Sequence, residues 1–482
     1  MAETPRSLKD FDLSIKKASK IVIEQAETGQ KIKIISHIDA DGLAAASIIG
    51  KALARKEALL TIQTCKQIDD RLIQELSAEE GSVIIFTDLG SGSLEALKTK
   101  LPKKEVLVFD HHQPINGAPS TITQVNPHLH GFDGSKEISG AGVAYLAAKS
   151  MDKKNVDLAP LAVIGALGDA QDKNEKRELV GFNKKILKDA TDTGLMKTEK
   201  DLIFYGRETR PIHKALAYTT NPYIPGLSGK EDNCLGFLVN LGINLKIEDR
   251  WKSISDLTVK EKQKIFSELA KFLSSKGFTN NITLSLIGTV YTLVNEDRWI
   301  PLRDAREYSS LLNACGRMNK SGIGIAIGMG SRGKILEEAQ EVLINYKKTL
   351  SEYMDWLTNT PKVIEELEHL YVINGTGVIN ELMLSTIASI VSSNGLFNYS
   401  KPILALTSAE NGMIKVSGRI SPHISHGRLN FGTILHNASS KFGGKGGGHD
   451  VAAGAKLPQE CTNEFIRVVN QMVGASIQEQ GM

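Results

Sequence analysis

Cysteine is scarce in this sequence. Its 482 residues include only four cysteines, Cys65, Cys234, Cys315 and Cys461, which lie far apart and form no C-x-x-C pair. Thiolate zinc sites and disulfide frameworks both depend on cysteines at characteristic spacings. We therefore expect neither a zinc site nor structural disulfides, and the thiols suit a reducing compartment.

Long hydrophobic runs are also missing. The longest apolar stretches, such as LAPLAVIGALG at 158–168, are too short and too interrupted to span a bilayer. The first residues, MAETPRSLKDFDLS, are too polar for a secretory signal peptide. We expect a cytoplasmic protein that does not associate with membranes.

The chain has no strong excess of one charge and few aromatic residues. It carries 58 basic and 55 acidic residues, for a net charge of +3, and 6% of its residues are aromatic. Its 41% apolar and 23% charged content is typical of a soluble globular protein. The sequence contains no internal repeat and no low-complexity tract, and its length predicts two or three domains.

The first 170 residues alternate between strand-like and helix-like segments. Strand-like runs rich in β-branched residues occupy 31–36, 58–65, 82–87 and 105–110, and helix-like segments occupy 42–56, 69–80 and 93–101. Strands that alternate with helices predict right-handed crossovers and a mostly parallel sheet. The continuous apolar character of these strands is typical of parallel strands buried on both faces. The fold class that we predict is α/β.

The rest of the chain predicts further domains. The alternation is lost from about 200 to 335, where turn formers and one amphipathic helix at 257–278 predict an inserted, mixed α/β domain. A long helical pattern follows, and an α/β pattern then continues to about 470. The expected segments are 1–195, 196–333, 334–360 and 361–482, with the end of the second returning to the first domain and the third forming a linker helix.

Acidic and imidazole side chains follow the predicted strands at their carboxyl ends. They are His37, Asp39 and Asp41 after the first strand, Asp88 after the third, Asp110, His111 and His112 after the fourth, and Asp169 and Asp172 after a later apolar segment. Open parallel sheets bind ligands outside the carboxyl ends of their strands. We therefore expect these side chains to converge at one edge of the sheet.

This set of residues predicts a metal centre. A single aspartate after a strand is usually a helix cap or a turn residue. Several carboxylates at one edge, however, repel each other unless cations neutralise them. Oxygen ligands with one or two imidazoles suit Mn²⁺, and Mg²⁺ is an alternative. Five or six such ligands, one of them able to bridge, can hold two ions about 3.5–4 Å apart that promote displacement at a phosphorus atom.

The motifs that carry these residues resemble those of a known family. HIDADG (37–42), TDLG (87–90), FDHH (109–112) and GALGD (165–169) are similar to the four successive motifs of the DHH phosphoesterases. The branch that the chain resembles is the archaeal RecJ-like exonucleases of the GINS-associated nuclease type, to which 138–150 and 311–322 are also similar. VSGRISP (416–422) and GGKGGGHDVAAGA (443–455) resemble the DHH-associated substrate-binding domain. Residues 200–305 match little of the family.

The resemblance implies a DHH catalytic domain at 1–195 that holds two ions. One metal would take Asp39 and Asp88, with His37 as a candidate third ligand. The other metal would take Asp41, Asp88, His111 and Asp169, so that Asp88 bridges the ions.

The same resemblance implies groups that meet the substrate. His112 would face the scissile phosphate, and Asp110 would orient its neighbours. The expected substrate-binding positions are Arg317, Ser417, Arg419, Gly447, Gly448 and His449. Arginine presents a planar fork to phosphate oxygens, and glycines let backbone N–H groups approach a phosphate closely.

The function that the resemblance implies is that of a two-metal exonuclease. Enzymes of the RecJ type degrade single-stranded DNA from 5′ to 3′, and some archaeal relatives act on RNA from 3′ ends. The resemblance also implies a role in DNA replication and repair, with GINS as a partner. A phosphodiesterase for short oligonucleotides or cyclic dinucleotides is the alternative within the enzyme class. A non-catalytic replication scaffold is the alternative outside it, because a helicase accessory subunit of this superfamily has lost much of its metal site. The sequence does not fix the polarity of digestion.

Overall fold

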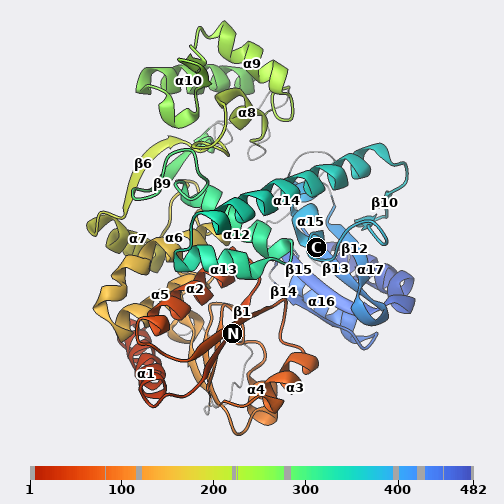
Figure 1. The fold of residues 1–482 in the computed structure, drawn as a ribbon. Coiled ribbons are helices and arrows are strands. Elements are labelled where there is room, and N and C mark those ends of the chain that lie inside the picture. The colour runs from red at the N-terminus through yellow and green to blue at the C-terminus, as the bar shows by residue number, and fades with distance from the viewer. Residues whose placement is uncertain are drawn as a thin grey trace. The chain divides into compact units, whose positions relative to one another are not determined.

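The computed structural model describes residues 6–81, 83–114, 122–219, 224, 226–275, 284–393, 401–420, 429–448 and 450–478. The chain divides into two compact units, Met1–Leu343 and Ile344–Met482. Figure 1 shows the helices and strands of both.

The first unit is built on a five-stranded sheet with the strand order β2-β1-β3-β4-β5. Its strands are β1 (Ile32–His37), β2 (Leu60–Cys65), β3 (Val83–Thr87), β4 (Glu105–Phe109) and β5 (Thr123–Val125). All neighbouring strands in it run parallel. The predicted α/β fold class is confirmed, and the four predicted strands coincide with β1 to β4 to within two residues at each end.

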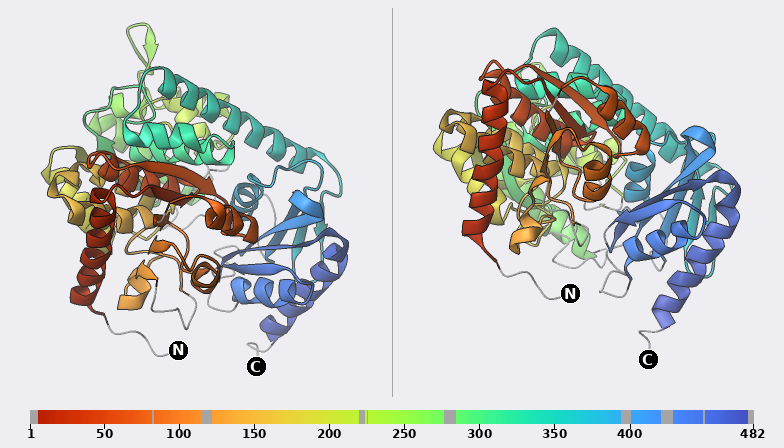
Figure 2. Two further views of the ribbon diagram at one scale, coloured as in Figure 1. Left: turned by 60° about the horizontal axis from the view of Figure 1, so that its bottom comes forward. Right: turned by 90° about the horizontal axis from the view of Figure 1, so that it is seen from below.

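Helices cover both faces of this sheet and explain why its strands are apolar throughout. On one face, side chains such as Ile35, Phe86 and Val108 pack against α3 (Asp70–Ala78) and α4 (Leu94–Lys100). On the other face, α2 (Ala40–Ala54) and α5 (Gly140–Met151) contact β1, β3 and β4 (Figure 2). Because both faces are covered, every residue of β3 is buried, as expected for a parallel strand.

Five further helices complete the core of the first unit. They are α1 (Leu8–Glu27), α6 (Ala159–Gly168), α7 (Gly181–Asp192), α12 (Ala305–Arg317) and α13 (Ser321–Met329). Helix α1, which the sequence reading did not predict, begins at the cap residue Ser7 and buries Phe11, Ile15 and Val22 on the face that contacts α5. Helices α6, α12 and α13 pack on α2.

A separate subdomain is inserted between two paired strands. The chain leaves the core through β6 (Met196–Leu202) and returns through β9 (Ile287–Leu293), which run antiparallel. Between them lie α8 (Ile212–Ala217), α9 (Glu231–Asn240), β7 (Lys246–Ile247), β8 (Arg250–Trp251) and α10 (Val259–Ser275). Buried residues such as Leu238, Ile265 and Leu269 form a hydrophobic cluster of their own here. The predicted amphipathic helix is confirmed as α10.

The second unit has a mixed sheet with the order β10-β11-β12-β13-β15-β14. Its strands are β10 (Ile364–Glu366), β11 (Tyr371–Asn374), β12 (Ile403–Ala409), β13 (Met413–Arg419), β14 (Lys445–Gly448) and β15 (Ala452–Pro458). The pair β11 and β12 is parallel, and the other neighbours are antiparallel.

Helices cover both faces of the second sheet as well. They are α14 (Lys334–Asn359), which enters from the first unit, α15 (Leu384–Ser393), α16 (Phe431–Ser440) and α17 (Thr462–Gln478). The C-terminal half of α14 and α15 pack on one face, and α16 and α17 pack on the other. Among the described residues, no helix is both long and apolar enough to cross a bilayer.

Candidate metal centre

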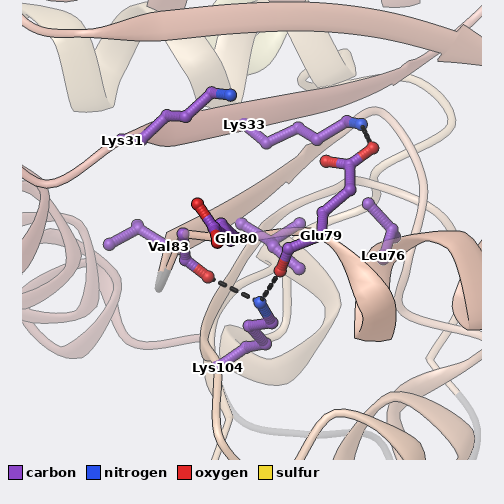
Figure 3. A pocket seen from close by; sticks show the side chains of 9 residues that line it. Lys31, Lys33, Leu76, Glu79, Glu80, Val83 and Lys104 are labelled. Carbon is purple, nitrogen blue, oxygen red and sulfur yellow. Dashed lines mark hydrogen bonds and ion pairs between the residues drawn. The ribbon is translucent and has the colours of Figure 1, made fainter.

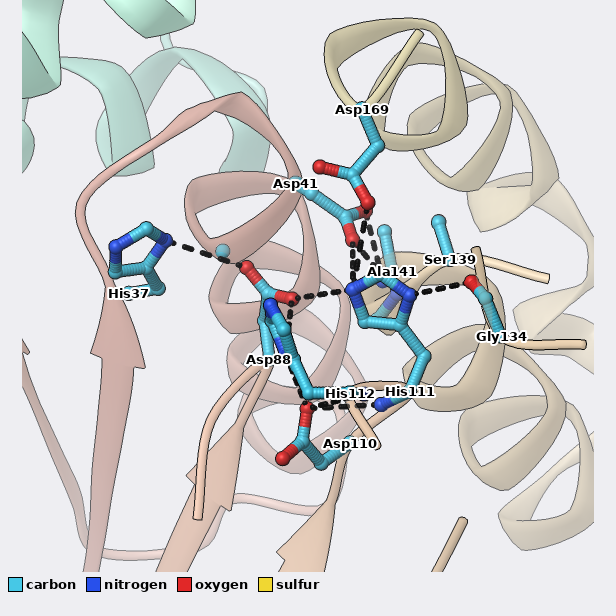
Figure 4. A network of polar contacts seen from close by, with 12 residues as sticks. His37, Asp41, Asp88, Asp110, His111, His112, Gly134, Ser139, Ala141 and Asp169 are labelled. Atoms are coloured by element: carbon cyan, nitrogen blue, oxygen red, sulfur yellow. Dashed lines mark hydrogen bonds and ion pairs between the residues drawn. The ribbon is translucent and has the colours of Figure 1, made fainter. Parts of the chain in front are cut away.

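The candidate site lies at the carboxyl edge of the first sheet. After β1 the chain adds β2 on one side and then crosses to add β3 on the other, so the strand order switches between β1 and β3. Open α/β sheets bind ligands in the crevice at such a switch point. The side chains that the sequence predicts as metal ligands come from the ends of these strands and of β4 and α6. Figure 4 shows that five of them point toward one another, which are His37, Asp41, Asp88, His111 and Asp169.

Asp41 is the most deeply buried carboxylate of the site, with no solvent exposure. Its Oδ2 accepts a hydrogen bond from Gly140 N at 2.6 Å, and its Oδ1 accepts one from Ala141 N at 3.0 Å. These N–H groups belong to the first turn of α5, where the helix dipole stabilises an anion. The fold therefore keeps this carboxylate in place inside the protein.

His111 presents a ring nitrogen to three carboxylates. Its Nδ1 lies 2.7 Å from the carbonyl oxygen of Gly134 and carries the proton, because a carbonyl oxygen only accepts. Its Nε2 lies 3.1 Å from Asp88 Oδ1, 3.3 Å from Asp169 Oδ2 and 3.6 Å from Asp41 Oδ2. This buried Nε2 has no hydrogen-bond partner within the described part of the chain. Metal-binding histidines typically have this arrangement, with the other ring N–H donated to a backbone carbonyl.

A second group of donor atoms shares Asp88. His37 Nδ1 lies 2.8 Å from Asp39 Oδ2 and 3.7 Å from Asp88 Oδ2. Neither contact has hydrogen-bond geometry, since Nδ1 is buried without a partner among the residues that the structure describes. Asp39 also caps α2, with its Oδ1 accepting from Gly42 N at 3.0 Å. The cap uses one carboxylate oxygen and leaves the other facing His37.

Asp88 joins the two groups in a strained backbone conformation. It is 1% exposed, its φ is +58°, and its Oδ1 has no hydrogen-bond partner in the described ranges. A positive φ is uncommon for any residue but glycine, and such strain concentrates at functional sites. A Cβ atom on Gly140 would lie 2.5 Å from Asp88 Oδ1, so only glycine fits beside this carboxylate.

Asp110 organises the two histidines that follow it. Its Oδ1 accepts hydrogen bonds from the backbone N of His111 at 2.8 Å and from Nδ1 of His112 at 2.8 Å. Its Oδ2 accepts from Ser91 N at 2.9 Å. Because Nδ1 of His112 is held in this way, its Nε2 is left to act on another group. The His112 side chain is 47% exposed, so it reaches solvent from the buried centre.

Carboxylates that face each other have raised pKa values. Burial raises the pKa of Asp41 well above its usual range, and the charges of Asp88 and Asp169 raise it further. Burial also raises the pKa of Asp169 to about 6, with His111 opposing the rise and Asp88 adding to it. Burial alone would lower the pKa of His111, but the surrounding carboxylates outweigh it and raise that pKa. The site therefore holds more negative charge than its imidazoles neutralise.

Two other carboxylates of the site, each close to a histidine, have lowered pKa values. Burial opposes ionisation, yet His37 lowers the pKa of Asp39 and His112 lowers that of Asp110. In return Asp39 overcomes the effect of burial and raises the pKa of His37 to about 10.

These residues fit a divalent cation. Ligand atoms within 4.8 Å of one another form three groups, which are His37, Asp39 and Asp88; Asp41, His111 and Asp169; and Asp88, His111 and His112. Carboxylate oxygens with imidazole nitrogens suit Mn²⁺ and Mg²⁺, whereas the described thiols lie outside these groups. A cation would also pair with the unpartnered atoms and stabilise the ionised carboxylates. The acidic cluster can therefore hold metal.

Two further residues near this edge differ in their placement. Arg317 is the last residue of α12, and its positive charge acts on the carboxylate of Asp39, so it lies near the donor groups. Asp172 was expected at the same edge, but this expectation is wrong. Its carboxylate is paired with Arg306 and belongs to none of the donor groups.

The structure places four of the predicted substrate-binding residues on one sheet of the second unit. Ser417 and Arg419 lie on β13, and Gly447 and Gly448 lie on β14. Strand β15 runs between them, and its Gly454 is the register partner of both Ser417 and Gly447. The four residues are therefore close neighbours in the sheet.

Their side chains differ in access to a ligand. Ser417 is only 2% exposed, so its hydroxyl is covered in this structure. The Arg419 guanidinium donates from Nε to Ser389 Oγ at 2.9 Å and from a terminal nitrogen to Gly418 O at 2.8 Å. His449 lies outside the described residues.

The sequence reading missed the backbone groups that surround the donors. The carbonyl of Gly134 and the N–H groups of Gly140 and Ala141 hold His111 and Asp41 in position. Backbone groups leave no mark in side-chain type, so only local patterns can reveal them. Here the signal was a cap residue, Ser139, before a small-residue helix start.

The opposite edge of the same sheet also carries charged residues, around a small cavity. The cavity has a volume of about 10 Å³ and is lined by Lys31, Lys33, Leu76, Glu79, Glu80, Gly81, Val83, Ile84 and Lys104 (Figure 3). Such a volume holds about one water molecule. Lys33 is paired with Glu79, and Lys104 Nζ donates to the carbonyl oxygens of Glu79 and Gly81 at 2.6 Å each. The cavity offers no room for an organic ligand.

Two curated proteins are similar to most of this chain. An uncharacterized protein of Methanocaldococcus jannaschii is 29% identical over 452 residues, which cover 92% of this chain and 94% of that protein. The single-stranded-DNA-specific exonuclease RecJ of Haemophilus influenzae is 22% identical over 510 residues, which cover 97% of this chain and 70% of that protein.

Solved structures share the fold. CDC45 from Entamoeba histolytica superposes with a TM-score of 0.65 at 14% identity, covering 96% of this chain and 99% of that one. RecJ from Thermus thermophilus in complex with Mn²⁺ superposes with a TM-score of 0.58 at 18% identity, covering 96% of this chain and 55% of that one. At such identities the similarity shows the fold.

Three family matches cover most of the described chain in sequence order. Residues 31–167 match the DHH family, N-terminal domain, residues 204–287 match the DHH-CID domain, and residues 376–475 match the DHHA1 domain. The first match contains most of the donor residues at the carboxyl edge of the first sheet. The chain therefore carries DHH, DHH-CID and DHHA1 domains, and it shares its fold with RecJ and CDC45.

Proposed function

We propose that this protein is a metal-dependent phosphodiesterase that degrades single-stranded nucleic acid from one end. The observation that carries the proposal is the buried Nε2 of His111, which faces three carboxylates and has no hydrogen-bond partner in the described part of the chain. Leaving a buried polar group unpaired costs about 1–3 kcal/mol, and neighbouring like charges add to that cost. Bound cations account for the arrangement.

The metal ligands in this proposal form two sets that share Asp88. One ion would be held by His37, Asp39 and Asp88. The other ion would be held by the set Asp41, Asp88, His111 and Asp169. Mn²⁺ is the proposed ion, with Mg²⁺ as the alternative, because both accept carboxylate and imidazole ligands. RecJ from Thermus thermophilus has been solved with Mn²⁺ and with Mg²⁺, which supports a divalent cation of this kind.

A pair of divalent ions supplies a water that ionises near neutral pH and positive charge for the phosphate oxygens. The chain itself supplies positioning and a proton. Asp41 is fixed by two backbone N–H groups, and Asp110 fixes the ring of His112 through Nδ1. Burial would lower the pKa of His112, but Asp110 outweighs burial and raises it. The Nε2 of this ring is the proposed proton donor to the scissile phosphate group.

The substrate is held by the residues that match the family motifs, which are Arg317, Ser417, Arg419, Gly447, Gly448 and His449. The position of Arg317 near Asp39 supports its role. Single-stranded DNA is the proposed substrate, because the H. influenzae relative is a single-stranded-DNA-specific exonuclease. Digestion from 5′ to 3′ is proposed from the resemblance to enzymes of the RecJ type. RNA digested from 3′ ends is the second candidate.

The proposed cellular setting rests on the resemblance to RecJ-type enzymes. We place the protein in the cytoplasm, in DNA replication or repair, with GINS as a partner. The proposed domains are the catalytic domain at 1–195, the inserted domain at 196–333, the linker helix at 334–360 and the substrate-binding domain at 361–482. The inserted subdomain has its own hydrophobic cluster, which supports a folded surface for partner docking.

Two other functions are compatible with the same fold. A phosphodiesterase for short oligonucleotides or cyclic dinucleotides would use the same centre with a smaller ligand. A non-catalytic replication scaffold would need no centre. The clustered carboxylates favour an enzyme, as do the nitrogens of His37 and His111 that lack a partner among the described residues.

The test uses the purified full-length protein with single-stranded DNA and RNA of graded length, each labelled at either end, and with Mn²⁺ supplied. The proposal expects stepwise shortening of long chains from one end, and the labelled end that is lost first gives the polarity. The matched variants are Asp88→Asn in the centre and Glu79→Gln at the opposite edge of the sheet. Only Asp88→Asn is expected to abolish cleavage.

The remaining outcomes assign the alternatives. Cleavage restricted to di- and trinucleotides would contradict the exonuclease and support the small-substrate enzyme. No cleavage with Mn²⁺ or Mg²⁺, together with retained partner binding, would contradict both enzymes and support the scaffold.

A further inference from the structure

Helix α12 contacts several of the segments that carry the metal donors. It begins after Asp304, whose Oδ1 accepts from Arg306 N at 2.9 Å and from Glu307 N at 3.1 Å. The Glu307 side chain, 3% exposed, accepts from Glu208 N at 3.0 Å and from the hydroxyl of Thr209. The start of the helix is therefore fixed to the segment that enters the inserted subdomain.

Arg306 connects this first turn to the loop that follows α6. One terminal nitrogen donates to Thr289 O in β9 at 2.8 Å, and the other donates to the carboxylate of Asp172. The Asp172 carboxylate is nearly buried, and it lies three residues after the proposed metal ligand Asp169. Between them, Ala170 has a φ of +56°, so this loop holds an uncommon conformation.

The last turns of α12 hold the other proposed ligand loop. Asn313 Oδ1 accepts from Ala40 N at 2.9 Å, and Ala40 lies between Asp39 and Asp41 in the chain. The contact is close, since a Cβ atom on Gly316 would lie only 1.6 Å from the carbonyl oxygen of Ile38. The helix backbone therefore rests directly on the loop.

We propose that α12 sets the distance between the two ligand loops, with Arg306 and Asn313 as positioning residues for the metal centre. A helix of 13 residues is stiff, so contacts at its two ends fix the Asp169 loop and the Asp39–Asp41 loop relative to each other. Metal sites require ligand positions correct to within about 0.5 Å. This inference rests on the proposed metal-dependent function, but its test measures metal binding without turnover.

The test is Mn²⁺ affinity, measured by calorimetry and by the electron paramagnetic resonance signal of free Mn²⁺, with no substrate present. Arg306→Met and Asn313→Leu remove the two contacts while keeping side-chain volume. Each is expected to weaken Mn²⁺ binding about 10-fold, at the lower end of the effect of outer positioning residues. Hydrolysis by both variants is expected to recover when Mn²⁺ is raised in proportion.

A double-mutant cycle tests whether Arg306 acts through Asp172. Asp172→Asn alone is expected to weaken Mn²⁺ binding to a similar extent, and the double variant with Arg306→Met is expected to be no weaker than either single variant. Additive losses would contradict a shared role. Should Arg306→Met fail to fold, Arg306→Lys keeps the charge but loses one of the two contacts, and an intermediate loss of affinity is expected.

The matched control is Arg55→Met. Arg55 is also partly exposed and also pairs with an aspartate, donating to Asp157 Oδ1 at 2.7 Å, but Asp157 belongs to none of the donor groups. The control should keep wild-type Mn²⁺ affinity. Wild-type affinity in Arg306→Met and Asn313→Leu would overturn the inference and leave the proposed function intact. A wild-type protein that binds no Mn²⁺ would overturn both.

Discussion

The two edges of the first sheet both carry charged side chains, but the charges are arranged differently. At the amino edge, Lys33 pairs with Glu79, and Lys104 donates to two carbonyl oxygens at the end of α3. At the carboxyl edge, His37 Nδ1, Asp88 Oδ1 and His111 Nε2 are buried without hydrogen-bond partners among the described residues. Charged residues occur at both edges, and buried polar atoms without a partner among the described residues distinguish the one that we interpret as a functional site.

The difference has a physical reason. An ion pair near the surface satisfies its own groups and contributes little to stability. Carboxylates clustered in a buried site destabilise the fold unless a ligand compensates for them. The carboxyl edge therefore has the electrostatic cost that is typical of active sites, and the amino edge does not.

The largest expected effect comes from Asp88→Asn. This change removes the carboxylate that the two donor groups share, so the metal ions are expected to bind poorly. Metal charge stabilises the transition state by several kcal/mol, and its loss corresponds to a decrease in hydrolysis of about 10³-fold or more. The same change relieves repulsion with Asp41 and Asp169, so the urea midpoint of the metal-free protein is expected to stay the same or rise. A variant that loses both activity and stability would contradict this account of the carboxyl edge.

His112→Ala is expected to have the next largest effect. A positioned proton donor contributes about 10²–10⁴-fold to a rate, so kcat is expected to fall by about that factor. Mn²⁺ affinity is expected to change little, because His112 is not among the proposed ligands. Titration with Mn²⁺ beside single-turnover kinetics separates the two quantities. A large loss of metal affinity would mean that His112 is a ligand.

Much of this site followed from the sequence because its donors stand at strand ends. Apolar runs such as those of β3 and β4 predict buried parallel strands, and parallel strands bring their carboxyl ends to one edge. The positions of Asp88 and His111 at this edge could therefore be predicted from the sequence pattern. The approach failed for Asp172, since a carboxylate that pairs with an arginine over 130 residues away looks the same in sequence as a metal ligand.

Two other features, the packing of helix α1 and the backbone support of Asp41, could not be predicted from the sequence for different reasons. Helix α1 has an amphipathic pattern without a motif, and nothing in its sequence tells which face of which helix it covers. The support of Asp41 by Gly140 N and Ala141 N comes from a backbone about 100 residues away. Such contacts depend on tertiary packing, which side-chain type alone does not encode.

A smaller expected effect is stabilisation by the metal. Mn²⁺ at 100 times its dissociation constant is expected to stabilise the folded protein by about 2.7 kcal/mol, measured as a shift of the urea midpoint. Binding is expected to weaken as the pH falls from 7.5 to 5.5. The ion must displace protons from groups with raised pKa values, including Asp169 at about 6. The stabilisation is expected to be absent in Asp88→Asn, and affinity that does not change with pH would contradict proton competition.

The smallest expected effect is at the amino edge, from Glu79→Gln. The change removes the charge that pairs with Lys33, and partly exposed ion pairs contribute about 0–1 kcal/mol, so the urea midpoint is expected to fall only slightly. Hydrolysis and Mn²⁺ affinity are expected to match the wild type, because Glu79 belongs to none of the metal donor groups and the cavity beside it has no room for a ligand. If Glu79→Gln lowered activity as Asp88→Asn does, unpaired charge would not be what separates the two edges.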